Sequence, residues 1–217
     1  MAELIGLHST KQKSTLTGSE VISAKDPAQG DGQPVSFDVD TLSDYVQGDS
    51  PASNVGTAAT GTTPTEYGND HFRKTVLAVS TTLPAIAGGA DLAVGKLLYT
   101  FPAGTIWIRN VYMSLAITQS EGNITADTPD GGLGTVIASG AVAVLSGTAT
   151  FENILTGQTF NDCDGAAETT AAAVDLLIKT ADAHTVHFNV ADGWAASGDA
   201  AAALAGTVVI DWMYVGA

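Results

Sequence analysis

The chain has 217 residues, with 23 acidic and eight basic side chains and a formal net charge of −15. Nucleic acids and anionic lipid surfaces are bound through clusters of Lys and Arg, so this charge balance argues against both as partners. A single cysteine excludes an intrachain disulfide, and the apolar runs are too short to predict a signal peptide or a membrane-spanning helix.

The residue pattern of segment 1–46 predicts an extended N-terminal arm. Glu20–Lys25 is a short β-prone run, and a dense cluster of turn residues follows it. In Val35–Val39, apolar and polar side chains alternate, which predicts a half-buried strand, and Leu42–Val46 favours one helical turn. Two short strands and one turn of helix bury too little surface to fold alone, so we expect the arm to pack on a partner.

The next segment, residues 47–69, is rich in Gly, Ser, Thr and Pro and is typical of a linker or an extended strap. From residue 70 to 217 the pattern predicts an all-β body. Short strands at regular spacing with Gly- and Asp-bearing turns indicate a β-sandwich or jelly roll. The predicted strands are Lys74–Thr82, Lys96–Phe101, Thr105–Ile117, Thr135–Leu145, Thr148–Leu155, Ala173–Lys179, Thr185–Val190 and Thr207–Val215.

Two of these segments carry more detailed expectations. Strict alternation along Thr105–Ile117 would place Ile106, Ile108 and Asn110 on one face of the strand and Trp107 and Arg109 on the other. The Ala-rich segment Ala195–Ala205 is predicted to be the one helix of the body, because alanine has the highest helix propensity.

The arm resembles the N-terminal, particle-binding modules of bacteriophage virion appendages. The residues that carry the resemblance are Leu-Thr-Gly-Ser-Glu-Val-Ile at 16–22 and Val-Ser-Phe-Asp-Val-Asp-Thr-Leu-Ser-Asp-Tyr at 35–45, with a Gly-rich turn between them. The body, at 95–104 and 132–140, is similar to small β-structural proteins of marine-type phages. The resemblance implies a decoration or cement protein, often trimeric, seated on the capsid. The expected capsid-contact residues are Leu16, Glu20, Val21, Ile22, Val35, Phe37, Leu42 and Tyr45.

The polar residues do not form a pattern typical of catalysis or of a cofactor site. His184 and His187 are three residues apart, so on one strand they would face opposite ways and could not share a metal; surface or interface positions are expected. The turn around Asp162 and Asp164 lacks the Gly and Glu positions of a calcium-binding loop and is expected to be an ordinary Asx-rich turn. Cys163 lies among acidic residues, which disfavour a thiolate nucleophile.

Trp107 on the long strand, and Trp212 with Tyr214 near the C-terminus, could form a ligand platform. On a single strand Trp212 and Tyr214 share one face, so core or subunit-interface positions are expected for them. Trp194 follows a glycine in a loop and is the better candidate for a contact residue. No metal, cofactor or catalytic residue is predicted. Aromatic residues make up only 6% of the chain, which argues against a sugar-cleaving groove.

The sequence therefore predicts a non-enzymatic virion protein, assembled in the host cytoplasm. In this hypothesis the arm binds the major capsid protein or another virion protein, and the body forms a homotrimer on the capsid surface. Two alternatives stay open. One is a tail or head fibre with a receptor-binding body, and the other is a cellular carbohydrate- or calcium-binding β-sandwich module.

Overall fold

A computed structural model describes residues 21–25, 34–38, 55–69, 71–88, 93–139, 144–194 and 197–216. The chain divides into two compact units, Met1–Pro51 and Ala52–Ala217. In the first unit, β1 (Val21–Lys25) pairs antiparallel with β2 (Pro34–Asp38). Both strands of the arm are thus confirmed. The helical turn expected over Leu42–Val46 lies outside the described residues.

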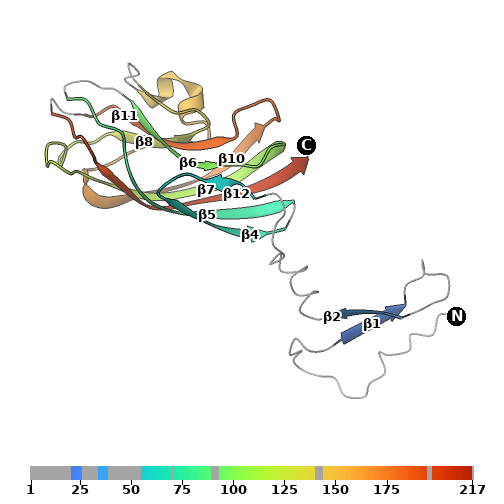
Figure 1. Ribbon diagram of the computed structural model, residues 1–217. Helices are drawn as coiled ribbons and strands as arrows, with labels where there is room; N and C mark the ends of the chain where they lie inside the picture. The colour runs from blue at the N-terminus through green and yellow to red at the C-terminus, as the bar shows by residue number, and fades with distance from the viewer. Residues whose placement is uncertain are drawn as a thin grey trace. The chain divides into compact units, whose positions relative to one another are not determined.

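The second unit is an antiparallel β-sandwich, as the strand pattern predicted (Figure 1). Sheet I has the strand order β10-β7-β12-β5-β4, and sheet II has the order β3-β6-β11-β8-β9. The strands of sheet I are β4 (Thr62–Gly68), β5 (Phe72–Thr82), β7 (Thr105–Thr118), β10 (Asp164–Ile178) and β12 (Ala203–Gly216). Those of sheet II are β3 (Thr57–Ala58), β6 (Val94–Thr100), β8 (Asp130–Gly134), β9 (Leu155–Thr159) and β11 (Thr185–Ala191).

The connections between strands identify the sandwich as a jelly roll. Of the eight strands from β5 to β12, sheet I contains the order β5-β12-β7-β10 and sheet II the order β6-β11-β8-β9. The chain passes to the other sheet after every one of these strands except β8, which forms a hairpin with β9. This is the winding of two Greek keys that defines the jelly roll. The expected fold class is therefore confirmed.

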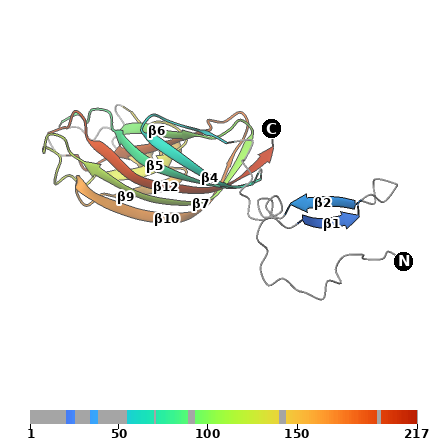
Figure 2. The ribbon, with the colours of Figure 1, turned by 60° about the horizontal axis from the view of Figure 1, so that its bottom comes forward.

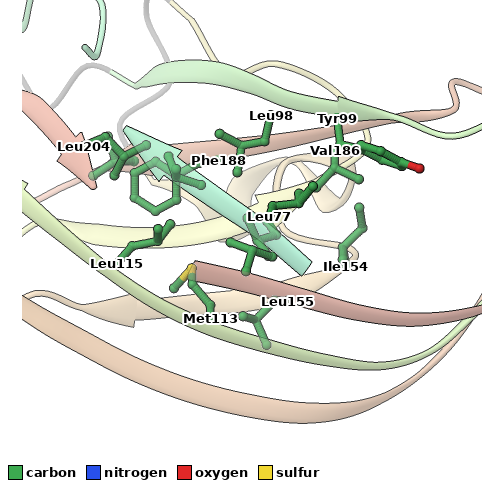
Figure 3. Packing of buried hydrophobic residues seen from close by; sticks show 14 of the residues in the cluster. Leu77, Leu98, Tyr99, Met113, Leu115, Ile154, Leu155, Val186, Phe188 and Leu204 are labelled. Carbon is green, nitrogen blue, oxygen red and sulfur yellow. The ribbon is translucent and has the colours of Figure 1, made fainter. Parts of the chain in front are cut away.

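The core lies between the inner faces of the two sheets. Alternate residues of β5, β7 and β12 from sheet I meet those of β6 and β11 from sheet II, and Figure 3 shows Leu77 and Met113 facing Leu98 and Phe188. These four side chains are fully buried. Burial of apolar surface at about 25 cal/mol per Å² is the dominant force that holds the sheets together.

A polar network also joins the two sheets. The Tyr99 hydroxyl of sheet II donates to Glu66 Oε1 at 2.6 Å, and Thr75 Oγ1 donates to Glu66 Oε2 at 2.7 Å. Trp212 Nε1 in turn donates to Thr75 Oγ1 at 2.8 Å. Burial raises the pKa of the Tyr99 phenol above its ordinary value, and the hydrogen bond to Glu66 raises it further. Tyr99 therefore remains a neutral donor.

The outer face of sheet II is covered by residues 135–139 and 144–154 of the same chain, here called the cover. This cover contains the short 3-10 helices η2 (Leu145–Gly147) and η3 (Ala149–Phe151), and its Leu145 and Phe151 pack on Ala191 of β11. From the outer face of β11, Asn189 accepts from Ala138 N at 2.8 Å and donates to the carbonyls of Val136 and Phe151 at 2.9 and 2.8 Å. Asn189 thus fixes the cover by three hydrogen bonds.

Several sequence expectations for this part of the chain are wrong. Segments 135–145 and 148–155 were predicted to be strands, but their described residues before Leu155 form no strand, and Ala138, Leu145 and Phe151 pack on sheet II. Segment 195–205 was predicted to be the helix, but its described residues 197–202 are not helical. Residues 203–205 begin the central strand β12 (Ala203–Gly216), where pairing on both sides overrides alanine's helix propensity. Residues 57–68 of the expected linker form β3 and β4 and pair with β6 and β5.

No helix among the described residues is long and apolar enough to cross a membrane.

Candidate functional site

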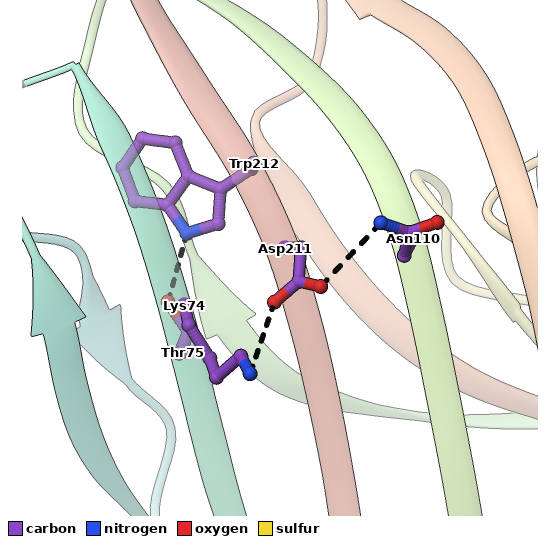
Figure 4. Close-up of polar contacts among 5 residues, drawn as sticks. All are labelled: Lys74, Thr75, Asn110, Asp211 and Trp212. Carbon is purple, nitrogen blue, oxygen red and sulfur yellow. Dashed lines mark hydrogen bonds and ion pairs between the residues drawn. The ribbon is translucent and has the colours of Figure 1, made fainter.

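The outer face of sheet I, which points away from sheet II, is the candidate site. A polar row crosses it where Tyr67 of β4 lies opposite Lys74 of β5, Lys74 opposite Asp211 of β12, and Asp211 opposite Asn110 of β7. Figure 4 shows the contacts: Lys74 Nζ lies 3.9 Å from Asp211 Oδ1, and Asn110 Nδ2 lies 3.5 Å from Asp211 Oδ2. These exposed, long contacts stabilise the fold little and leave the polar groups available.

An apolar row lies beside the polar one, nearer the C-terminal end of β12. Phe72 of β5 is opposite Met213 of β12, Met213 is opposite Trp107 of β7, and Trp107 is opposite Leu177 of β10. Phe72 is 60% exposed and Leu177 47% exposed. Outward positions of an antiparallel sheet normally carry polar residues where the face meets water. Four consecutive large apolar residues across four strands therefore need an explanation.

A β-bulge places Arg109 between the two rows. The consecutive residues Asp211 and Trp212 of β12 pair with Asn110 and Ile108, so Arg109 is one extra residue in β7. Its guanidinium lies 4.2 Å from the centre of the Trp107 ring, and Trp107 Nε1 donates to Asp175 Oδ1 at 2.7 Å. Strict alternation along this strand would place Val111 and Met113 on the face opposite to Ile106 and Ile108. The extra residue shifts the alternation, so all four side chains are buried.

A groove runs along this face. It has a volume of about 750 Å³ and is lined by residues of both rows, among them Tyr67, Phe72, Lys74, Arg109 and Met213. On the other side of the polar row, Val76, Val209 and Tyr112 form a second apolar row, with Tyr112 39% exposed. The outer face of sheet I thus alternates an apolar row, a polar row and another apolar row.

The charges of this face differ from those of the rest of the body. From residue 52 onward the sequence has 15 acidic and five basic residues. Around the two rows, the outer face of sheet I carries Lys74, Arg109, Asp175 and Asp211, so its charges balance there. The face can therefore approach an acidic surface, or another copy of itself, without the repulsion that the remaining surface would produce.

The arrangement offers a surface for binding. In the described part of the chain there is no cluster of His, Cys, Asp and Glu that could hold a metal ion. The side chains of the groove contain no serine, cysteine or histidine that could act as a nucleophile beside a base. What they offer is exposed apolar area flanked by hydrogen-bonding groups.

The two histidines occupy different environments. His184 Nε2 lies 2.5 Å from the Gly104 carbonyl oxygen and is partly buried. His187 lies on β11 beneath the cover and is only 8% exposed, so the expectation of a surface position is wrong for it. Burial lowers the pKa of His187, since the charged imidazolium is disfavoured away from water.

The turn around Asp162 and Asp164 is held by local hydrogen bonds. Asp164 N donates to Asp162 Oδ1 at 3.3 Å, and Asn161 donates to Glu168. The neighbouring carboxylate of Asp164 raises the pKa of Asp162. Cys163 is fully buried, and burial, followed by the charge of Asp127, raises the pKa of its thiol to about 12. The thiol is thus kept protonated and away from solvent.

The remaining predicted residues divide between the core, the candidate site and the arm. Trp212 is buried, as expected for a core residue, and Trp194, expected as a loop contact, is instead buried in the core at 6% exposure. Trp107 belongs to the outer face of sheet I. Of the eight residues predicted to contact the capsid, Val21 and Ile22 lie on β1, and Val35 and Phe37 on β2. The other four, Leu16, Glu20, Leu42 and Tyr45, lie outside the described residues.

Sequence reasoning missed the candidate site because its residues are far apart in the chain. Phe72, Met213 and Trp107 become neighbours only through the strand order of sheet I. One signal was present: the predicted strands around Val76 and Val209 are apolar at outward as well as inward positions, which is typical of a sheet covered on both faces.

Comparisons with known proteins give no family for the chain. No family model and no curated protein matches it. Among solved structures, an arabinose-bound α-L-arabinofuranosidase is similar over 72% of this chain, with a TM-score of 0.31 and 10% identity. The match covers 23% of that enzyme, so the chain spans less than a quarter of its length. A similarity this low carries no argument about activity.

Proposed function

We propose that this chain is a non-enzymatic structural protein of a bacteriophage particle, a decoration or cement protein whose N-terminal arm binds the capsid. The observation that carries the proposal is the division into two units, in which the body from Ala52 completes its own core. Its sandwich is closed by residues of the body, so the hairpin of β1 and β2 is not needed to fold it.

Two further observations support the proposal. The hairpin contains residues 21–22 and 35–38 of the motif that resembles phage appendage modules, with Ile22 opposite Phe37. A hairpin of two five-residue strands gains stability by packing on another protein. The jelly roll is also a fold of viral capsid domains, although it occurs in lectins too and does not specify a function by itself. The partner is then the major capsid protein or a neighbouring virion protein, at the particle surface.

A fibre with a receptor-binding body is the second candidate function. The groove with Tyr67 and Phe72 favours it, because exposed aromatic rings beside polar side chains can stack on a sugar. The two candidates differ in copy number, since a decoration protein covers the capsid while a fibre occurs at a few positions.

The test is quantitative mass spectrometry of purified particles, with copies of this chain counted against the major capsid protein. We expect a ratio near one, or one trimer per capsid position; a few copies per particle would favour the fibre, and absence would overturn the virion proposal. Deletion of residues 1–46 should leave a folded body that no longer binds particles. A deletion of residues 1–15, which keeps the motif at 16–45, is the matched control and should retain binding.

A further inference from the structure

We propose that the outer face of sheet I is the surface through which copies of this chain associate. The inference names the surface through which the homo-oligomer of the proposed function would form. Only the expected threefold symmetry of that oligomer rests on the proposed function. Attachment to a particle and self-association are separate properties, so each can fail without the other.

The two sheets of the body differ in how their outer faces are covered. On sheet II the cover (residues 135–139 and 144–154) lies over β11, where every residue from Val186 to Ala191 is buried. On sheet I no described segment of the body occupies the corresponding position, and Phe72, Tyr112 and Leu177 remain 60%, 39% and 47% exposed. Figure 2, seen with sheet I turned forward, shows β4, β5, β12, β7 and β10 as an open layer. Large apolar patches on one face mark interaction sites.

The distribution of charge over the body favours a second copy of the chain as the partner of this face. The body as a whole is strongly acidic, so two copies repel each other over most orientations. The outer face of sheet I is the exception, because Lys74 and Arg109 balance Asp175 and Asp211. When two such faces meet, they bring together neutral surfaces and direct the acidic remainder of each body away from the contact.

The size of the face also fits a stable association. Five strands of 7 to 15 residues, spaced by about 4.8 Å and rising about 3.4 Å per residue, give a face of roughly 1,000 Å². A standard protein–protein interface buries about 800 Å² on each partner. The sheet face of one copy is thus large enough to form the whole contact.

The edges of the sheets are less suited to self-association. β3 has two residues and β9 has five, and β4 carries Pro64, which removes a backbone donor. β10 is long, but it carries register shifts in its pairing with β7. Bulges of this kind twist an edge away from regular pairing. The face therefore remains the best surface for a second copy.

The test is the mass of the full chain in solution, measured by light scattering and sedimentation over a concentration series. We expect an oligomer, and a trimer would agree with the threefold expectation while a dimer would equally support the face. Tyr112→Glu and Phe72→Glu should each raise the dissociation constant at least about tenfold, because each would place an unpaired carboxylate in the contact.

Ile137→Glu is the matched control. Ile137 is 45% exposed and lies in the cover over sheet II, so the same change there should leave the mass unaltered. Circular dichroism and thermal melting of each variant establish that the body is folded. A wild-type chain that is monomeric at about 50 µM, where a contact with a Kd of about 1 µM is nearly complete, overturns the proposal. So does an oligomer that survives both variants on sheet I, or one that Ile137→Glu dissociates equally well.

Discussion

At the scale of single residues, Asn189 does more for the fold than its residue type suggests. It is fully buried on β11 and satisfies one amide and two carbonyls of the cover. A buried amide side chain is stable only when its donors and acceptors are paired, and the same holds for the backbone groups that it serves. Asn189 therefore links the position of segment 135–154 to sheet II.

We expect Asn189→Ala to lower the free energy of unfolding by about 3 kcal/mol, since it removes three hydrogen bonds and leaves buried backbone groups without partners. Urea unfolding followed by tryptophan fluorescence measures the change. Asn123→Ala, at an exposed position, is the control and should alter stability by less than about 0.5 kcal/mol. Equal stability of the two variants would show that the cover is held by its apolar contacts alone.

At the scale of elements, the chain is most predictable where strands are long and alternate strictly. β5, β7 and β11 were predicted close to their bounds because each has β-branched or aromatic residues with a period of two. The cover was not predicted, because an apolar segment packed on the back of a sheet has the composition of a strand. The bulge at Arg109 was also missed, since one inserted residue leaves no mark in the composition.

The central strand β12 contains a glycine that no other residue type can replace without strain. Gly206 has a φ of +139°, and a Cβ atom there would lie 2.1 Å from the Ser114 carbonyl oxygen. We expect Gly206→Ala to destabilise the body by at least about 2 kcal/mol, through both the backbone conformation and the close contact with β7. Thermal unfolding measures this. Gly147→Ala, where the nearest atom to the new Cβ would be 3.4 Å away, should be nearly neutral.

At the scale of the whole molecule, the sequence predicted the fold class of the body better than it predicted any surface. Alternation reveals which residues face inward, but the strand order decides which outward residues become neighbours. Tyr67, Lys74, Asp211 and Asn110 come from three distant regions and form one row because β5 and β12 are adjacent. No local pattern contains that information.

Acid affects the whole molecule through two opposing effects. Protonation of exposed carboxylates reduces the repulsion of a chain with a net charge of −15, which is a weak, salt-screened stabilisation. Asp199 acts in the opposite direction. It is 2% exposed and accepts from Ser120 N at 2.7 Å, Ser120 Oγ at 2.6 Å, Glu121 N at 3.0 Å and Ala201 N at 2.9 Å. The backbone of Asp199 also pairs with that of Ile86. Asp199 therefore connects its own loop to the loops that contain Ile86 and Ser120.

Burial alone would raise the pKa of Asp199, but the hydrogen bonds from Ser120, Glu121 and Ala201 outweigh it and the pKa is lowered. A lowered pKa means that the stabilisation is fully present above the unfolded-state value of about 3.9 and is lost as pH falls through the folded-state value. We expect Asp199→Asn to cost on the order of 3 kcal/mol at neutral pH, because its amide cannot accept from all four donors.

Wild type and Asp199→Asn should then converge in stability as the pH is lowered below about 4, where the wild-type carboxyl gains its proton. Urea unfolding at a series of pH values measures both curves, and Asp182→Asn, at an exposed turn, should run parallel to the wild type. A constant difference between wild type and Asp199→Asn over this range would mean that Asp199 acts through shape and not through its charge.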